Sequence, residues 1–170
     1  MNYGFLKRLI SFLAVIGIIL TFYYFMDLKE EEKNSYPSET GQKVLLKVER
    51  SGGECSYGGC YSEIFIYQDG MYLYKEKTQQ ELKGSFSKEE IKKLEELISA
   101  EDFKKIKSKK FTGQCPVEYD GSELIYTFYQ SNGESERIAS CEFEVDKNSP
   151  LFKHVSELLN KIYLQLSSRI

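Results

Sequence analysis

The longest uninterrupted hydrophobic run lies near the amino end, from Leu9 to Met26 (LISFLAVIGIILTFYYFM), and it contains no charged residue. As a helix it would rise about 27 Å, which is close to the hydrocarbon thickness of a bilayer. The run is apolar on all sides rather than along one stripe, which argues against a helix on the surface of a soluble core. We therefore predict a transmembrane helix over residues 9–26.

The charges on either side of this run predict its orientation. Lys7 and Arg8 precede it, and a polar, acid-rich stretch, residues 27–42, follows it. The positive-inside bias then places residues 1–8 in the cytoplasm and everything after Met26 outside the cell membrane. No small-residue cleavage site follows the run, and the first cysteine is far beyond it. We therefore expect an uncleaved, single-pass signal anchor rather than a cleaved signal peptide or a lipoprotein signal.

Beyond the linker at 27–42, strand patterns alternate with helix patterns. Alternation of apolar residues predicts a strand over 43–50, with Val44, Leu46 and Val48 on one face. Two further strand pairs flank the turn sequences Asp69-Gly70 and Asn132-Gly133, so two hairpins are expected.

Helix signals follow each hairpin. Ser87 to Glu90 form a capping box before an apolar stripe, a short helix is expected around Phe103, and the last helix begins with Ser149 as its cap and Pro150 at its first position. The order predicts an α+β domain over residues 43–170. It consists of an antiparallel sheet of about five or six strands from two hairpins, with two or three helices packed on one face.

The first hairpin supplies a candidate binding surface. A two-residue turn at Asp69-Gly70 would pair Tyr67 with Tyr72 and Phe65 with Tyr74, so the four aromatic side chains would share one face. Tyrosine-rich surfaces favour recognition because their rings bury a large area at a low cost in conformational entropy. The alternative is that a helix covers this face and that the rings belong to the core.

The four cysteines are Cys55, Cys60, Cys115 and Cys141. In an extracytoplasmic domain cysteines normally oxidise, so disulfides are expected. The expected register of the second hairpin places Cys141 on the inner face opposite Leu124, within reach of the loop that holds Cys115. We therefore predict a Cys115–Cys141 bridge and a local Cys55–Cys60 bridge. A zinc site and free thiols remain alternatives, and no Cys-x-x-Cys redox motif occurs.

The sequence contains few other candidates for catalytic or ligand-binding residues. The net charge of −3 and the absence of a basic block argue against nucleic acid as a partner. The single histidine, His154, flanks the apolar stripe of the last helix and is expected to pack there. Four acids form a cluster that could serve a glycosidase-like reaction or bind calcium, although a solvated turn is the simpler interpretation: Glu118, Asp120, Glu123 and Glu142. We expect no catalytic residue, no metal and no cofactor.

The stretch FTGQCPVEYDGSELIYTFY, the later SCEFEV and the cysteine loop leading into YSEIFIYQDGMY resemble a group of small bacterial envelope proteins. These proteins share a Cys-Pro-x-x-Tyr-Asp-Gly loop, a tyrosine-rich strand and a later Ser-Cys, and they carry a lipoprotein or other export signal. The resemblance covers most of residues 51–165. It supports the Cys115–Cys141 pairing and an envelope location, and it implies no assigned activity and no catalytic residue.

These observations favour a membrane-anchored, non-catalytic binding module of the cell envelope. Its expected partners, besides the membrane, are an envelope protein, a peptide or a glycan. The first alternative is a cell-wall or glycan hydrolase that uses the acidic cluster. The second is a structural subunit of an envelope complex.

Overall fold

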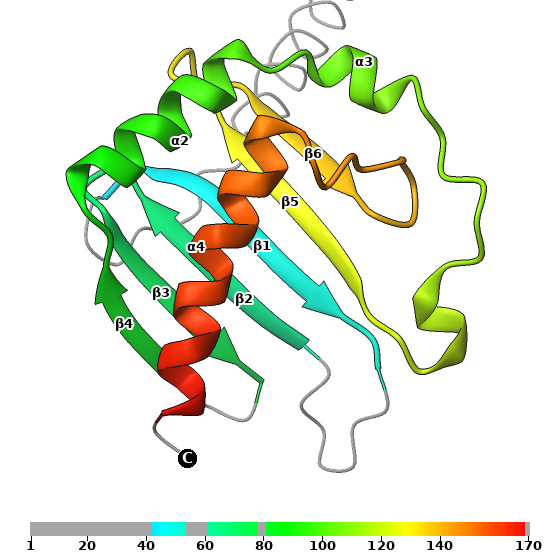
Figure 1. Ribbon diagram of the computed structural model, residues 1–170, viewed down its shortest axis with the longest axis horizontal. Coiled ribbons are helices and arrows are strands. Elements are labelled where there is room, and N and C mark those ends of the chain that lie inside the picture. Colours follow the sequence, from blue (N-terminus) through cyan, green and yellow to red (C-terminus); the bar gives the residue numbers. More distant parts are fainter. Residues whose placement is uncertain (1–41, 54–60, 78–80, 169–170) are drawn as a thin grey trace, which may run out of the picture. The chain divides into compact units, whose positions relative to one another are not determined.

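The computed structural model describes residues 42–53, 61–77 and 81–168, all of which fall in the unit Ser38–Ile170 (Figure 1). The predicted transmembrane helix at 9–26, the amino terminus, nearly all of the linker and the Cys55–Cys60 pair lie outside the described residues. Within the described residues, no helix combines the length and the hydrophobicity needed to span a bilayer.

Six antiparallel strands form one sheet in the order β4-β3-β2-β1-β5-β6. Their bounds are β1 Val44–Ser51, β2 Tyr61–Tyr67, β3 Met71–Glu76, β4 Glu81–Ser85, β5 Glu123–Tyr129 and β6 Ser135–Ala139. The predicted α+β class and antiparallel sheet are therefore confirmed. The edge strand β4 was not predicted because it is short and contains Gly84. That glycine is required there, since a Cβ atom would lie 2.3 Å from the Tyr72 hydroxyl oxygen.

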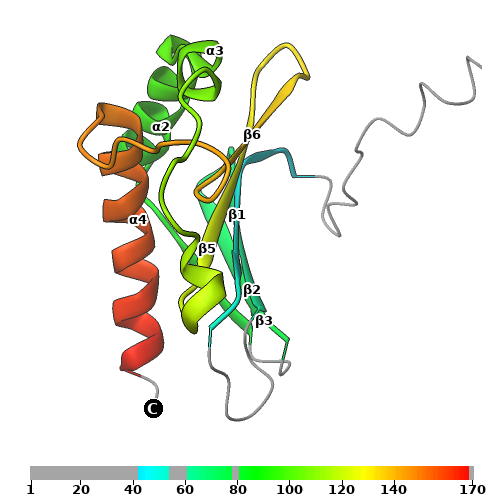
Figure 2. The same ribbon diagram turned by 90° about the vertical axis from the view of Figure 1, so that its right-hand side faces the viewer.

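The helices lie on one side of the sheet, as Figure 2 shows, which confirms the predicted layering. Their bounds are α2 Lys88–Ala100, α3 Phe103–Lys107 and α4 Pro150–Ser167, and a 3-10 turn, η1, covers Pro116–Tyr119. The capping box of α2 is present, and the Ser149 side chain caps α4 as expected. These short-range signals were reliable because they depend on a few neighbouring residues.

The core lies between the sheet and the two longer helices. Leu46, Ile64 and Phe128 are at most 1% exposed on the helix-facing side of the sheet, and α4 contributes Leu158 and Ile162, also at most 1% exposed. An aromatic cluster joins the sheet to the helices, with ring centroids 5.2 Å apart in each of the pairs Tyr126–Phe152 and Phe103–Phe128.

The first hairpin is shifted by one residue from the predicted register. Tyr72 pairs with Ile66 and Tyr74 with Ile64, because the loop has three residues and only Gly70, at φ +92°, adopts a positive φ angle. Asp69 instead accepts a 2.9 Å hydrogen bond from the backbone N–H of Met71. In a strand, a shift of one residue moves a side chain to the opposite face.

The other expected registers are also offset. The second hairpin pairs Ile125 with Ala139, so Cys141 follows the strand instead of lying opposite Leu124, and Ile138 takes the inward position. Strand β1 has a register irregularity between Val44 and Leu46. Val44 pairs with Tyr67 and therefore lies on the opposite face of the sheet from Leu46. The loop geometries that cause these offsets are set by hydrogen bonds that a hydrophobic pattern does not reveal.

Candidate functional site

The predicted aromatic binding face does not form. Tyr72 and Tyr74 are 1% and 8% exposed and belong to the core beneath the helices. Phe65 and Tyr67 are half-buried and alternate with Ile64 and Ile66 along β2, so they lie on the opposite face of the sheet. The one-residue shift of the hairpin therefore separates the four side chains into two pairs. This corrects the prediction in favour of the alternative in which helices cover the tyrosines.

The four acids of the predicted cluster have different environments: two make structural contacts and two lie on an exposed turn. The Glu123 carboxylate accepts a 3.2 Å hydrogen bond from the backbone N–H of Cys141, and Glu142 forms a 2.8 Å ion pair with Arg137. Glu118 and Asp120 are exposed on η1 and at its end. Within the described residues, no group of three or more His, Cys, Asp or Glu side chains could hold a metal ion.

The Cys-Pro-Val-Glu-Tyr-Asp-Gly loop is compact for identifiable reasons. Cys115 forms a disulfide with Cys141, with Cα atoms 5.3 Å apart, which confirms that predicted pairing. Pro116 begins η1, and Asp120 ends it in the left-handed conformation at φ 61°. Gly121 returns so close that a Cβ atom would lie 2.5 Å from the Cβ atom of Pro116. The loop is thus a tight turn that the disulfide joins to the segment just after β6.

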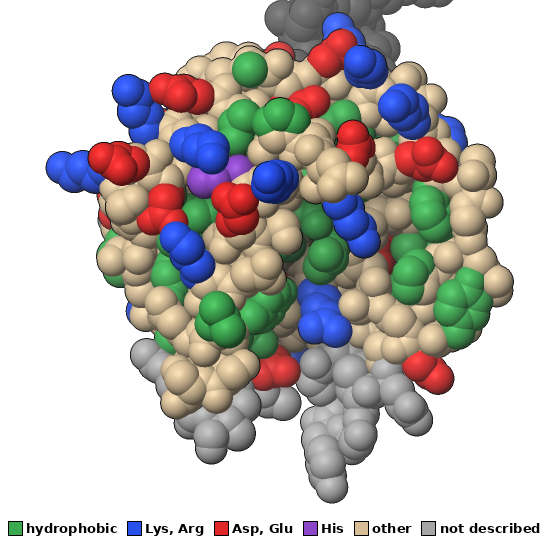
Figure 3. All heavy atoms as spheres, viewed as in Figure 1, with side chains coloured by type: hydrophobic (Ala, Val, Ile, Leu, Met, Phe, Trp, Pro, Cys, Tyr) green, Lys and Arg blue, Asp and Glu red, His purple; other side chains and the backbone are tan. Residues whose placement is uncertain are grey.

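A groove lies beside this loop, on the helix-covered face of the sheet. It has a volume of about 380 Å³ and apolar walls made by Phe111, Pro116, Leu124 and Val145. In Figure 3 hydrophobic side chains are visible in the depression beside α4, with Lys and Arg side chains along it. The disulfide adjoins both sides of the groove, because Cys115 precedes Pro116 and Cys141 follows Ser140.

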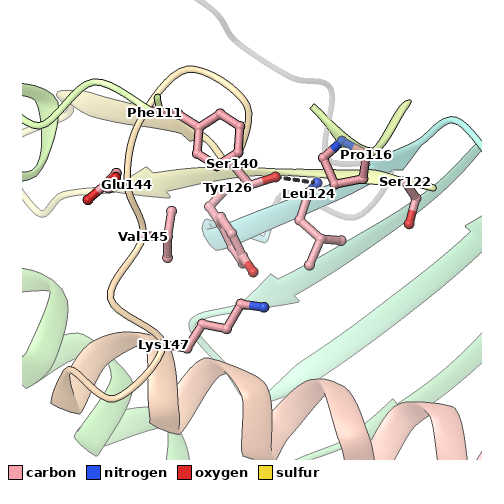
Figure 4. A pocket seen from close by; sticks show the side chains of 9 residues that line it. All are labelled: Phe111, Pro116, Ser122, Leu124, Tyr126, Ser140, Glu144, Val145 and Lys147. Carbon is pink, nitrogen blue, oxygen red and sulfur yellow. Dashed lines mark hydrogen bonds between the residues drawn. The ribbon is translucent and has the colours of Figure 1, made fainter. Parts of the chain in front are cut away.

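The polar lining of the groove consists mainly of hydrogen-bond donors. It includes Ser122, Tyr126, Ser140 and Lys147 (Figure 4). We call this hollow, lined by these four residues and the four apolar ones, the donor groove. The remaining lining residue, Glu144, lies at the rim with its carboxylate turned away from Tyr126 in Figure 4.

Two of the hydroxyl groups are held by bonds that use one lone pair of the oxygen and leave the proton. Ser140 Oγ accepts a 3.0 Å hydrogen bond from the backbone N–H of Leu124, and Ser122 Oγ accepts a 3.0 Å bond from Arg50 Nε. A serine hydroxyl has one proton to donate and two lone pairs. Each serine is therefore oriented by the protein while its O–H remains available to a ligand.

Lys147 and Tyr126 supply the other two donors. Their ammonium and hydroxyl groups point towards the same space in Figure 4. Burial, with a smaller contribution from nearby Tyr163, raises the pKa of Tyr126 to about 12, so its hydroxyl stays protonated at neutral pH. In residues 42–53, 61–77 and 81–168, no carboxylate forms an ion pair with Lys147.

Three other features of the described residues contain polar or titratable groups in partly enclosed positions. On the uncovered face of the sheet, Lys47 is 3% exposed and its ammonium lies 2.7 Å from Glu63 and 3.2 Å from Glu49, so its charge is neutralised within the protein. Tyr61 completes this cluster with 2.8 Å hydrogen bonds to both carboxylates, and burial, followed by these bonds, raises its pKa.

A second hollow of about 270 Å³ is lined in part by Gln68 and Glu95, whose side chains are joined by a 2.9 Å hydrogen bond. His154 is 5% exposed and lies 3.0 Å from the Glu90 carbonyl oxygen, which links α4 to α2. The expected packing role of His154 is therefore confirmed.

Sequence reasoning did not select the donor groove. Leu124 and Tyr126 were expected to face inward. Ser140 fell between the inward positions expected for Ala139 and Cys141, and Phe111 and Lys147 lie on segments with no periodic pattern. One signal was present, because the predicted Cys115–Cys141 bridge already implied that Pro116 and Ser140 are neighbours. No protein-family model, curated protein or solved structure matches the chain.

Proposed function

We propose that this chain is a membrane-anchored, extracytoplasmic binding module of the cell envelope and that it takes its ligand in the donor groove. The observation that supports binding is a concave site with apolar walls and four hydrogen-bond donors. Sites of this kind, in which a few polar groups converge on an apolar pocket, are typical of ligand binding.

The proposed location rests on the sequence. The uncharged run at 9–26, with Lys7 and Arg8 before it, supports a single-pass anchor with its carboxyl-terminal domain outside. The resemblance of the Cys-Pro-x-x-Tyr-Asp-Gly loop to small envelope proteins supports the same compartment. A disulfide at Cys115–Cys141 is consistent with an oxidising environment.

The groove is a better basis for this function than the acidic cluster is. Glu123 and Glu142 are engaged by the Cys141 backbone and by Arg137, so they are not free to act as a general acid and base on a bound substrate. In the donor groove, the hydroxyl protons of Ser122 and Ser140 and the ammonium of Lys147 remain available to a ligand.

The proposal can be tested with the full-length chain in detergent micelles and a soluble digest of bacterial cell wall, which contains both peptides and glycans. Fragments retained after dialysis are identified by mass spectrometry. We expect retention by the wild type and its loss in Leu124→Trp, because Leu124 lines the groove and the larger side chain fills it. Leu164→Trp is the matched control, since Leu164 is 71% exposed on α4.

Equal retention by wild type and Leu124→Trp, with both proteins folded by circular dichroism, would contradict binding in the groove. Shortening of the fragments during incubation would instead favour the hydrolase. In that case the four acids of the cluster are replaced by their amides, and loss of shortening identifies them as the cause.

The proposed location has its own test. A cysteine-reactive reagent that cannot cross the membrane is applied to intact cells after reduction. We expect labelling of the chain without lysis. Labelling that appears only after lysis would place the domain in the cytoplasm and contradict the envelope assignment.

A further inference from the structure

The chemistry of the donor groove, if it is the binding site proposed above, restricts the class of ligand. Each of its four central polar groups can donate a hydrogen bond: the hydroxyls of Ser122, Ser140 and Tyr126 and the ammonium of Lys147. A donor that a ligand covers without supplying an acceptor loses its hydrogen bonds to water without replacement. A ligand that carries several acceptors can therefore satisfy all four groups.

Among the described residues that line the groove, Lys147 is the one cation and Glu144, at the rim, is the one anion. Lys147 points into the groove, whereas the second nearby cation, Arg50, is bound through its Nε to Ser122. Glu144 at the rim opposes a ligand with two negative charges. One ammonium matches one carboxylate, and hydrogen bonds between charged partners are stronger than neutral ones.

The arrangement of the donors distinguishes a peptide from a fatty acid. Ser122 and Ser140 are separate from the Lys147–Tyr126 pair in Figure 4. A fatty acid would place methylene groups against the serine hydroxyls and leave them without acceptors, whereas the carbonyl oxygens of a peptide can accept from them. The volume of about 380 Å³ is at the small end of ligand pockets and suits a chain end rather than a long segment.

We propose that the donor groove binds the carboxyl-terminal end of a short peptide. The terminal carboxylate accepts hydrogen bonds from Lys147 and Tyr126, and backbone carbonyl oxygens accept from Ser122 and Ser140. An apolar side chain of the peptide packs against the walls at Phe111, Leu124 and Val145.

The test uses the full-length chain in detergent micelles at pH 7 and two pools of N-acetylated tripeptides of random sequence. One pool ends in a free carboxylate and the other in an amide. Retained peptides are quantified by mass spectrometry after equilibrium dialysis. We expect the free-acid pool to be retained roughly tenfold more strongly than the amide pool, as the loss of one charge-assisted bond implies.

Variants assign the effect to the groove. Lys147→Gln should lower retention of the free-acid pool about tenfold, to the level of the amide pool. Lys153→Gln is the matched control, because Lys153 is exposed on α4, does not line the groove and loses the same charge. Retention by this control should equal that of the wild type.

Dodecanoate is measured in the same assay as a fatty acid. Four outcomes would overturn the inference: equal retention of the two pools, failure of both pools to bind, insensitivity to Lys147→Gln, or stronger binding of dodecanoate than of the tripeptides. The proposed function is judged separately by the wall digest and Leu124→Trp. Retained wall fragments with no preference for carboxylate-terminated peptides would therefore leave a binding module whose ligand class is different.

Discussion

The two sides of the helix-covered face are held together in different ways. Beneath α4, Leu151, Val155, Leu158 and Ile162 are at most 1% exposed and pack against the sheet. Around the donor groove, Val117 and Tyr119 are 43% and 50% exposed. There the chain is held by the Cys115–Cys141 disulfide and by backbone hydrogen bonds, including 3.1 Å from Phe111 N–H to the Glu142 carbonyl and 2.9 Å from Glu144 N–H to the Lys109 carbonyl.

This difference shows how a small domain can keep a concave site open. Close packing stabilises the α4 side, but it leaves no room for a ligand. Covalent and backbone links hold the groove side without filling it, so its apolar and polar side chains remain accessible. The predictions below change one side at a time.

The largest effect is expected from the packed side. Leu158→Ala removes a side chain that is 1% exposed between α4 and the sheet. The lost burial and the cavity should lower the free energy of unfolding by about 2–5 kcal/mol, measured by chemical denaturation. Leu164→Ala, at a position 71% exposed on the same helix, should change it by less than about 0.5 kcal/mol. Similar losses in the two variants would contradict the packing described for α4.

The next effect concerns the groove side. The double variant Cys115→Ser, Cys141→Ser removes a bridge across a sequence separation of 26. We expect a loss of about 2–4 kcal/mol of unfolding free energy. Hydrogen exchange should increase most in residues 109–122 and 140–148. An equal increase throughout α4 would mean that the two sides are not held independently.

A smaller effect is expected where the two sides meet. The Ser149 side chain accepts a 3.5 Å hydrogen bond from the Phe152 backbone N–H and caps α4 immediately after the segment that carries Lys147. Ser149→Ala should cost about 1 kcal/mol, while Ser149→Asp should retain most of the stability because aspartate is also a good cap. Equal losses in both variants, measured by thermal unfolding, would argue against the capping role.

The smallest effect is a pH dependence on the packed side. The hydrogen bond from Lys161 is the main cause that lowers the pKa of Glu90 from 4.5 to about 2. Since the folded-state pKa is the lower one, the stabilisation is present above pH 4.5 and is lost as the pH falls towards 2. Lys161 is 56% exposed, so solvent screening limits the contribution to less than about 1 kcal/mol.

Lys161→Gln should therefore lower stability at pH 7 and match the wild type near pH 2. Lys92→Gln removes the more exposed 3.8 Å pair with Glu96 and serves as the control. A difference between Lys161→Gln and wild type that persists at pH 2 would exclude the ion pair as its source.

The predictable parts of this molecule are those with short-range signals. The capping box at Ser87 and the Ser149 cap located both long helices, and residue alternation located most strands. The strand registers of the two hairpins were wrong because both loops are longer than the turns that were assumed. The first hairpin was given a two-residue turn, but its loop at Gly70 has three residues, and the loop of the second hairpin at Gly133 is also longer than expected. A one-residue error exchanges the two faces of a strand, and this is why Tyr72 and Tyr74 were expected on a binding surface.

The donor groove was beyond this kind of reasoning. Its residues come from the loop before β5, from β5 itself and from the segment between β6 and α4, and they meet only in the folded chain. The disulfide was the one long-range contact that the sequence indicated correctly, and it brings Pro116 and Ser140 to the two sides of the groove. A disulfide predicted from the sequence therefore helps to locate a site that has no sequence motif.

Backbone amide chemical shifts of the full-length chain, recorded with and without the free-acid tripeptide pool, test the central claim most directly. We predict that the largest shift changes lie at Ser122, Leu124, Ser140 and Lys147, around the donor groove. Changes centred on Phe65 and Tyr67, on the opposite face of the sheet, would contradict the account, and so would the absence of any change at saturating peptide.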